Sequence, residues 1–218
     1  MARRLMLAKQ VGAVSYYKGR ISSVVGTGTV VPWPRYSSYL DIEPDLAVVV
    51  GEIPFGASRR LAAERIAGYT VFCDISARDV QLAEMFGFGP TASKDMDCGN
   101  VLGPWLVTPD EIDDVRGLSV EVATDRGRVW RGSTAEYLLD PIDVIVALAT
   151  RQSLAAGSVI GMGTVPGCCG LDRDEWLDPG ERIIITVAGL GALHLSFGVP
   201  DGPVESGWES RPNIPTIG

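Results

Sequence analysis

The chain has 218 residues, an apolar fraction of 46% and a formal net charge of −8. This length suits one globular domain, which we expect to span residues 1–218 with its core at about 14–199. The negative charge argues against nucleic acid and anionic membranes as partners, because both need a basic surface. No run of 18 apolar residues is present, so we expect a cytoplasmic protein.

The composition favours strands over long helices, because 26 glycines and 14 prolines indicate many turns. We therefore expect a mixed, mainly β fold with short helices, in which loops carry the function. Four cysteines, Cys73, Cys98, Cys168 and Cys169, lack metal-ligand spacing and are expected to be reduced structural thiols. The one histidine, His194, lies in an alternating run typical of a late strand, which argues against Ser-His-Asp and Cys-His schemes.

The first part of the chain is predicted to be extended. Residues 11–25 have the pattern of two short β-like pieces, and 26–42 form an extended connection that cannot be helix. The apolar run 46–50 predicts a buried strand. Just before it, Glu43 and Asp45 project from the same side, because the side-chain period of an extended chain is two. This pattern fits either two solvated acids or a pair of carboxylates aimed at one ligand.

A strand followed by a helix is predicted for the segment 68–81, GYTVFCDISARDVQ. Its first half alternates like a strand, and after Asp74 the residues 76–79 predict a helix cap and a helix of about ten residues. Arg78 and Gln81 are three residues apart and share a face near the start of that helix, where free backbone N–H groups favour an anion. Asp74 is either an ordinary turn residue or a functional acid, and Arg78 and Gln81 are either surface residues or ligand contacts.

Two further elements flank this segment. Residues 57–67 predict a short surface helix. Residues 91–100 predict an irregular polar loop that contains Lys94, one of three lysines among nineteen basic residues. Lysine carries a compact charge whose pKa falls in a buried site, which makes Lys94 a candidate functional residue.

The second half of the chain is predicted to hold five strands and one helix. The strands cover 102–108, 118–124, 128–131, 182–188 and 192–199. Asp140 and Pro141 predict the start of a helix that ends near Thr150. The tail 200–218 is expected to be mobile or to contact a partner.

Several motifs together resemble the C-terminal domain of the fumarylacetoacetate hydrolase family, from about residue 14 to 199. In chain order they are YYKGRISSVVG, DIEPDLAVVVG, GYTVFCDISARDVQ, the Lys94 loop followed by LGPWLVT, GMGTVPG, and WLDPGERI followed by GLGAL. Each motif is weak alone, but their order and spacing are specific. The resemblance implies a twisted β-roll or sandwich of the fumarylacetoacetase C-terminal type, which forms a homodimer and has a metal site in a cleft.

The same resemblance implies roles for individual residues. The implied metal ligands are Glu43, Asp45 and Asp74. The implied substrate contacts are Tyr17, Arg78, Gln81, Lys94 and Thr164, of which Lys94, Arg78 and Gln81 are the expected catalytic residues. Oxygen ligands without His or Cys select a hard cation, so we expect Mg²⁺ or Mn²⁺.

The resemblance also implies an enzyme that acts on a small β-diketo, β-keto or 2-oxo acid. The metal would chelate a 2-oxo acid and stabilise the enolate that forms when a neighbouring C–C bond breaks. Hydrolysis of the C–C bond and decarboxylation share this enolate. A second hypothesis is an isomerase, dehydratase or cyclase that uses it in a biosynthetic pathway. A third is a metal-binding pseudoenzyme, or a partner subunit of a full-length relative.

Two departures from the family pattern affect these expectations. The family's first acidic pair is Glu-x-Glu, whereas this chain has Glu43-x-Asp45, a shorter arm that shifts the metal or admits a water. Hydrolytic members also carry a water-activating His/Glu pair on an N-terminal lid, and we expect this chain to lack that lid. General-base help is worth about 10²–10⁴-fold in rate, so the missing pair favours decarboxylation over hydrolysis.

Overall fold

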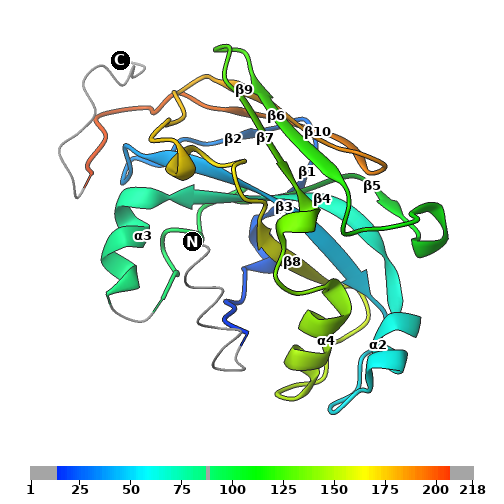
Figure 1. Ribbon diagram of the computed structural model, residues 1–218. Coiled ribbons are helices and arrows are strands. Elements are labelled where there is room, and N and C mark those ends of the chain that lie inside the picture. Colours follow the sequence, from blue (N-terminus) through cyan, green and yellow to red (C-terminus); the bar gives the residue numbers. More distant parts are fainter. Residues whose placement is uncertain (1–13, 87–88, 207–218) are drawn as a thin grey trace.

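The computed structural model describes residues 14–86 and 89–206. Within these residues, two five-stranded β-sheets lie one above the other, with short helices at their ends (Figure 1). The first sheet has the strand order β1-β5-β4-β3-β8, and the second has the order β2-β10-β9-β6-β7. The prediction of a mainly β fold of two sheets with short helices is confirmed.

The strand and helix bounds are as follows. The first sheet consists of β1 (Val24–Gly26), β5 (Asn100–Val107), β4 (Ile66–Ala77), β3 (Leu40–Val50) and β8 (Ser158–Thr164). The second consists of β2 (Thr29–Val31), β10 (Gly191–Phe197), β9 (Arg182–Val187), β6 (Ser119–Thr124) and β7 (Val129–Ser133). The α-helices of the described residues are α2 (Arg59–Glu64), α3 (Arg78–Met85) and α4 (Pro141–Ala149), and 3₁₀ turns lie at Ile21–Ser23, Pro109–Glu111, Thr134–Glu136 and Gly170–Asp172.

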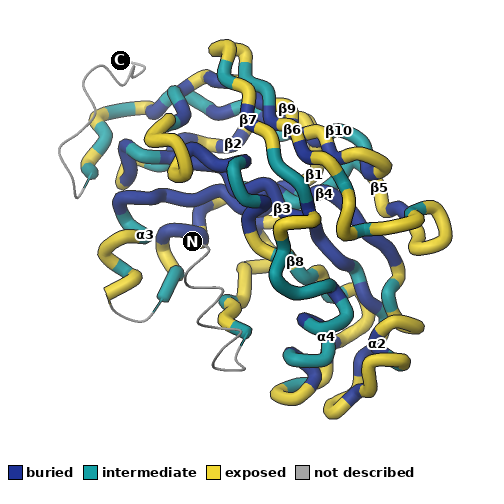
Figure 2. The backbone as a smooth tube through the Cα atoms, viewed as in Figure 1, coloured by how far each residue is buried: buried dark blue, intermediate teal, exposed yellow. Residues whose placement is uncertain are grey.

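The central strand β3 separates the apolar core from a polar face. Ile42 and Leu46 are buried in one apolar cluster with residues of the second sheet such as Ile185 and Leu193. Burial of a side chain of this size stabilises the fold by about 1.5–3 kcal/mol. The acidic residues of β3 alternate with these apolar ones and therefore point to the opposite face of the sheet. Figure 2 shows that β3 and β4 are buried along most of their length, so the acidic face is covered too.

Helix α4 begins as the sequence predicts. The Asp140 side chain accepts a hydrogen bond from the backbone N–H of Asp143, and Pro141 occupies the first turn. Both features favour a helix start, because they suit backbone N–H groups that lack helical partners. Arg59 of α2 pairs with Asp140 and Asp143, which joins the two helices that lie side by side in Figure 1.

The helix predicted to start at Ser76 starts two residues later, at Arg78, within the predicted cap segment 76–79. Strand β4 continues through Ala77, which pairs with Leu40 of β3, and the cap residue of α3 is Ala77 without a side-chain cap bond. The Ala77 N–H donates to the Ser93 carbonyl at 2.8 Å, which keeps the chain extended up to this point. Helix α3 is therefore shorter than predicted, and the hydroxyl of Ser76 is free for another partner.

The N-terminal prediction is also corrected in part. Residues 11–13 of the segment 11–25 lie outside the described residues; within 14–25, only Val24 and Val25 belong to a strand, and 14–20 have no regular secondary structure. The connection 26–42 is extended as predicted and contains strand β2. The expectation for the tail concerns residues 200–218, of which 207–218 lie outside the described residues.

Candidate active site

The strand register places four of the predicted site residues in two neighbouring rows of the first sheet. Glu43 of β3 is directly opposite Asp74 of β4, and Asp74 is opposite Asn100 of β5. On the other side, Asp45 of β3 is opposite Thr164 of β8. Directly opposite residues have Cβ atoms about 4.5–5.5 Å apart. Residues from four distant parts of the sequence therefore meet on the polar face.

Arg78 is held at one end of this row by two carboxylates. Its Nε and Nη2 atoms donate to Asp41 Oδ2 at 2.8 and 2.6 Å, and its Nη1 atom donates to Glu43. The same Nη1 atom donates to Gln81 Oε1 at 2.7 Å, which is the contact expected from their three-residue spacing. Arg78 is only 3% exposed, so it is a buried residue and not one of the helix surface.

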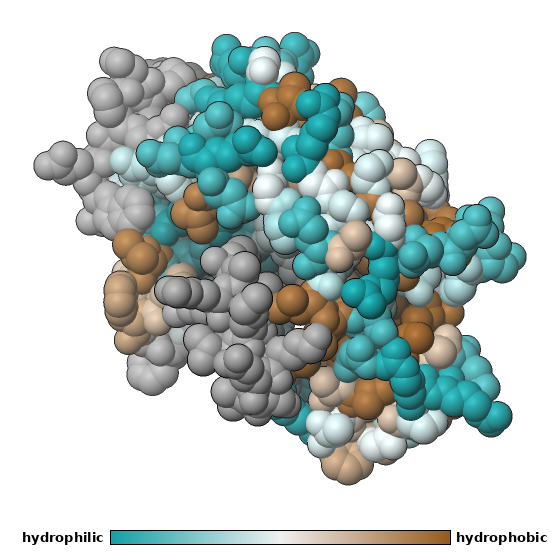
Figure 3. Space-filling model, viewed as in Figure 1, coloured by the Kyte–Doolittle hydropathy of each residue, from teal (hydrophilic) through white to brown (hydrophobic). Residues whose placement is uncertain are grey.

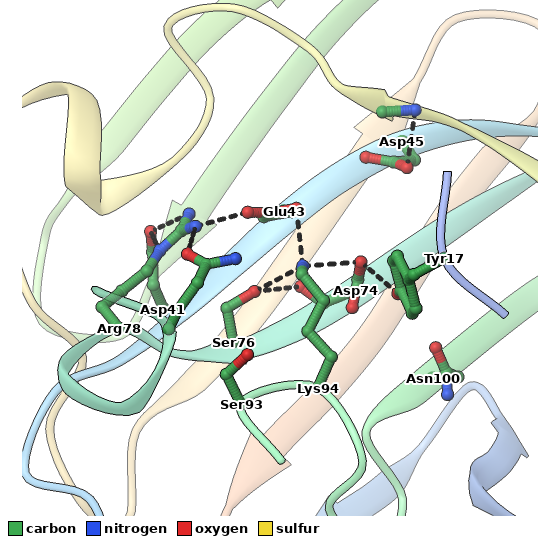
Figure 4. A network of polar contacts seen from close by, with 12 residues as sticks. Tyr17, Asp41, Glu43, Asp45, Asp74, Ser76, Arg78, Ser93, Lys94 and Asn100 are labelled. Atoms are coloured by element: carbon green, nitrogen blue, oxygen red, sulfur yellow. Dashed lines mark hydrogen bonds and ion pairs between the residues drawn. The ribbon is translucent and has the colours of Figure 1, made fainter. Parts of the chain in front are cut away.

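Lys94 lies between the two carboxylates that face each other across β3 and β4. Its Nζ atom donates to Glu43 Oε2 at 2.8 Å, to Asp74 Oδ2 at 2.7 Å and to Ser76 Oγ at 2.8 Å (Figure 4). These three acceptors match the three donors of an ammonium group. The Lys94 side chain is therefore fully hydrogen-bonded and points into the middle of the site.

Tyr17 reaches the same place from the segment before β1. Its hydroxyl donates to Asp74 Oδ2 at 2.6 Å, and Lys94 Nζ lies 5.6 Å from the centre of its ring. Figure 4 shows the ring beside Asp74, on the side of the site away from Arg78. Tyr17 thus covers Asp74 and Lys94 although it belongs to a segment without regular secondary structure.

Asp45 stands apart from the cationic side chains (Figure 4). Its Oδ2 atom accepts the backbone N–H of Gly163 at 2.9 Å. Gly163 has a φ of +93°, which glycine adopts without the strain that a Cβ brings. The Oδ1 atoms of Asp45 and Asp74 are both buried, and no group among the described residues hydrogen-bonds to them.

The charges of the site do not balance. Four carboxylates (Asp41, Glu43, Asp45 and Asp74) are buried with two cations (Arg78 and Lys94), and every one of the six residues is at most 5% exposed. If all were ionised, the cluster would carry two negative charges in excess. An unpaired carboxylate is costly to bury, because burial removes the water that solvates it.

The pKa values follow from this imbalance. Burial raises the pKa of Asp45 well above its usual range, and the charges on Glu43 and Asp74 raise it further. Burial acts in the same direction on Glu43, but Lys94 and then Arg78 outweigh it and lower the Glu43 pKa below its ordinary value. Asp45 is therefore the carboxyl group that most readily holds a proton.

The pKa of Lys94 does not fall in its buried site. Burial lowers the pKa of an ammonium group, but the charges on Glu43 and Asp74 outweigh burial and raise the Lys94 pKa. Burial and the Asp74 charge likewise raise the pKa of Tyr17. Lys94 is thus an ammonium donor and Tyr17 a neutral phenol at ordinary pH.

The donor set of this cluster fits a hard divalent cation in its chemistry. The excess of two negative charges and the two unpartnered carboxylate oxygens are the features that such an ion satisfies. In its described conformation the cluster is not a formed metal centre. Among residues 14–86 and 89–206, no three His, Cys, Asp or Glu side chains are placed to hold an ion together. Lys94 stands between Glu43 and Asp74 instead.

The described residues therefore bring together most of the predicted site, while the predicted roles stay predictions. Glu43, Asp74, Arg78, Gln81, Lys94 and Tyr17 form one continuous hydrogen-bonded network. Thr164 lies close enough to lower the pKa of Glu43, although no hydrogen bond of ordinary geometry joins its hydroxyl to a partner among the described residues.

The prediction missed Ser76, which accepts a hydrogen bond from Lys94, and Asp41. Asp41 is fully buried and accepts the Arg78 guanidinium as well as the backbone N–H groups of Ile42, Gly170 and Leu171. The signal was present, because Asp41 precedes Glu43 by two residues and so shares its side of the strand. His194, in contrast, is exposed on β10 of the second sheet, as the alternating pattern predicts.

The fold and the site together define the class of protein. It is a mainly β domain of two facing sheets, with a buried acidic cluster on the polar face of one of them. Residues 3–197 match the model of the family described as fumarylacetoacetate (FAA) hydrolase C-terminal. The chain belongs to the fumarylacetoacetate hydrolase family.

Individual relatives agree with this assignment. An uncharacterised protein of Pyrococcus abyssi is 33% identical over 79% of this chain and 74% of its own length. The structure of 5-carboxymethyl-2-hydroxymuconate delta-isomerase from Mycobacterium smegmatis is 27% identical, with a TM-score of 0.72 over 88% of this chain and 73% of that chain. The structure of 2-hydroxyhepta-2,4-diene-1,7-dioate isomerase from Mycobacterium marinum is 26% identical, with a TM-score of 0.72 over 83% and 67%.

The match does not extend over the full length of all relatives. The chain spans 57% and 60% of two curated relatives from Staphylococcus saprophyticus and Burkholderia ambifaria. What a full-length relative does is therefore a matter of proposal for this chain.

Proposed function

We propose that this chain is a divalent-metal-dependent enzyme that acts on a small β-diketo or 2-oxo acid through an enolate, by C–C bond hydrolysis or decarboxylation. The observation that carries the proposal is the buried excess of carboxylates, in which Asp45 Oδ1 and Asp74 Oδ1 lack a partner among the described residues. Membership of the fumarylacetoacetate hydrolase family supports the same chemistry.

Glu43, Asp45 and Asp74 are the residues that would hold the metal. A bound Mg²⁺ or Mn²⁺ supplies a Lewis acid that polarises the oxygens of a 2-oxo acid and stabilises the negative charge of its enolate. For this, the three carboxylates must turn toward one another, and Asp45 must lose the proton that its raised pKa favours. Oxygen ligands alone do not distinguish Mg²⁺ from Mn²⁺.

The other residues of the network would bind and orient the substrate. Asp41 fixes the Arg78 guanidinium, and Arg78 in turn occupies the Gln81 oxygen, so the Gln81 amide nitrogen is left to donate to a substrate oxygen. Once Glu43 and Asp74 turn toward a metal, the Lys94 ammonium would be released from them to donate to a substrate carboxylate and to protonate the carbon left after bond cleavage. Tyr17 and Thr164 would add hydroxyl groups to the walls of the site.

Turnover of oxaloacetate and of an acylpyruvate, each with Mg²⁺, tests this function. Release of CO₂ from oxaloacetate indicates decarboxylation, and release of a carboxylic acid from the acylpyruvate indicates hydrolysis. We expect either activity to fall to background after Asp74→Asn and to persist after Asp125→Asn, an exposed aspartate in the turn between β6 and β7. Turnover that survives Asp74→Asn would contradict the proposed site.

Isomerisation through the same enolate is the second candidate, because two similar solved structures are named as a 5-carboxymethyl-2-hydroxymuconate delta-isomerase and a 2-hydroxyhepta-2,4-diene-1,7-dioate isomerase. This reaction needs removal of the proton from the enol hydroxyl and protonation of a carbon atom, with no attacking water, and Lys94 and Tyr17 place two proton-bearing groups side by side. The assay is the loss of ultraviolet absorbance as 2-hydroxyhepta-2,4-diene-1,7-dioate loses conjugation. Metal binding without turnover of any of these compounds would instead favour a pseudoenzyme.

A further inference from the structure

A carboxylate outside the cluster, on helix α3, binds the turn that precedes Lys94. Glu84 lies one helical turn beyond Gln81. It accepts five hydrogen bonds: from the N–H and hydroxyl of Thr91, from the N–H of Ala92, and from the N–H and hydroxyl of Ser93. Three consecutive backbone N–H groups therefore converge on one side chain, as they do on an anion in a tight backbone turn.

The turn that Glu84 binds leads directly to Lys94. The Lys94 N–H donates to the Thr91 carbonyl at 3.0 Å, and the Ser93 carbonyl accepts the Ala77 N–H at 2.8 Å. Residues 91–93 are thus fixed by α3 on one side and by the end of β4 on the other. Ser93 is fully buried, so the turn has little freedom to move without breaking these bonds.

The position of Lys94 needs such support. Its ammonium lies at the end of a flexible four-carbon chain and makes three hydrogen bonds inside the site. A side chain of this kind is placed by the backbone that carries it, and here that backbone is an irregular loop. The residues next to Lys94 must therefore be held from outside the cluster.

We propose that Glu84 is a positioning residue, which fixes the turn 91–93 so that the Lys94 ammonium stays between Glu43 and Asp74. Through Glu84, helix α3 positions both cations of the site, because its first residue is Arg78. That Glu84 places Lys94 is inferred from geometry alone, whereas the effect of Glu84 on catalysis rests on the function proposed above.

The charge of Glu84 is essential to this role. A carboxylate offers two accepting oxygens, whereas the amide of glutamine offers one and presents N–H donors in place of the other. After Glu84→Gln, several of the five donors would face an N–H group or lose their partner. Burial raises the Glu84 pKa, but the hydrogen bonds from Ser93, Thr91 and Ala92 together outweigh it and hold the pKa at about 2. The acceptor is therefore ionised throughout the neutral range.

Chemical labelling of lysine tests the placement without any assay of activity. The chain has only three lysines, and mass spectrometry resolves the acetylation of each one. Lys94 is 5% exposed and Lys18 is exposed, so the second serves as an internal reference. We expect Glu84→Gln to raise the labelling of Lys94 relative to Lys18 several-fold. The matched control, Glu52→Gln, changes an exposed glutamate at the opposite end of β3 and should leave the ratio at the wild-type value.

Turnover of oxaloacetate with Mg²⁺ tests the catalytic consequence. Residues that orient a functional side chain typically cost about 10–100-fold in activity when replaced, and we expect a fall of this size in kcat for Glu84→Gln. The affinity for oxalate, measured by calorimetry, separates positioning of Lys94 from a general structural role. In the Lys94→Met background, Glu84→Gln should not change this affinity further, because the side chain that Glu84 positions is already absent. If Glu84 had a structural role alone, Glu84→Gln would lower the oxalate affinity equally with and without the Lys94 side chain.

Two results would overturn the proposal. The first is an unchanged labelling ratio in both Glu84→Gln and Thr91→Val, the milder variant that removes a single hydroxyl donor. The second is an equal loss of oxalate affinity with and without Lys94. If the wild-type protein turns over none of the substrates, the proposed function fails, and the labelling ratio alone still decides whether Glu84 positions Lys94.

Discussion

The four buried carboxylates of the site differ in the partners that they have. Asp41 accepts from a guanidinium and three backbone N–H groups, and Glu43 accepts from both cations. Asp74 accepts from Lys94 and Tyr17 and keeps one free oxygen, while Asp45 accepts a single amide. Hydrogen-bond saturation thus decreases along β3 from Asp41 to Asp45. The saturated end is structural, and the unsaturated end is where a cation or substrate gains most.

Removal of Asp41 should destabilise the protein strongly. Asp41→Ala leaves Arg78 buried with one carboxylate fewer and also removes the acceptor of two N–H groups in the 170–171 turn. Breaking a buried ion pair from one side costs about 3–5 kcal/mol. We expect a loss of this size in the free energy of unfolding, measured by urea denaturation. Asp201→Ala, at an exposed position, should change it by about 0.5 kcal/mol or less.

Glu84 makes stability depend on pH at the acid end. Its pKa in the folded protein is about 2, below the ordinary value of 4.5, so the folded state favours the ionised form. This contribution is fully present above pH 4.5 and is lost as the pH falls toward 2. The difference in melting temperature between wild type and Glu84→Gln should therefore shrink as the pH is lowered from 5 to 2.5. A constant difference would show that the ionised carboxylate is not what binds the turn.

At the scale of the elements, the close packing of β8 against β3 and β4 places Asp45. A Cβ added to Gly161 would lie 2.8 and 2.9 Å from carbons of the Phe72 ring and 3.0 Å from Asp45 Oδ2. Gly161 itself is exposed, so the cost comes from these close contacts: Gly161→Ala should displace β8 and lower the free energy of unfolding by about 1–3 kcal/mol, the range for overpacking. Gly26 of β1 is the matched control, because a Cβ there meets nothing within 4 Å. Equal stabilities of the two variants, measured by thermal unfolding, would contradict this account.

The elements also show what the sequence alone could predict. Alternation of acidic and apolar residues on β3 places Glu43 and Asp45 on one side, and the Asp140-Pro141 start of α4 is a local signal, so both predictions succeed. The end of β4 was misplaced because Ser76 has the local signature of a helix cap. Pairing with β3 and the hydrogen bond from the Ala77 N–H to the Ser93 carbonyl keep this part of the chain extended instead. Local patterns do not contain such long-range contacts.

The geometry inside the site was beyond prediction for the same reason. No spacing in the sequence indicates that Glu84 binds the turn before Lys94, or that Asp41 holds Arg78, because each contact depends on how separate elements meet. The resemblance to a family identified the residue types of the site. The placement of the Lys94 ammonium between Glu43 and Asp74, and the rise of its pKa, follow only from the assembled charges.

At the scale of the whole molecule, hydrophilic and hydrophobic side chains share the visible surface. The face drawn in Figure 3 shows hydrophilic side chains around separate hydrophobic patches. Within residues 14–86 and 89–206, none of the helices combines the length and the apolar character that a membrane span requires. The expected homodimer stays a prediction, which light scattering of the purified protein checks directly.

Binding of a divalent ion should stabilise the whole domain. An ion that binds only the folded state adds about 2.7 kcal/mol at a concentration of 100 times its Kd. For a domain of about 150–250 residues, 1 kcal/mol shifts the melting temperature by about 2–4 °C, so we expect Mg²⁺ or Mn²⁺ to raise it by about 5–10 °C. The gain should be larger above the Asp45 pKa, because the ion displaces the proton that this buried carboxyl group holds.

Asp45→Asn and Asp74→Asn should abolish the shift, whereas Asp125→Asn should keep it. An equal shift in all three variants would locate the ion elsewhere and leave the carboxylate cluster as a structural network alone.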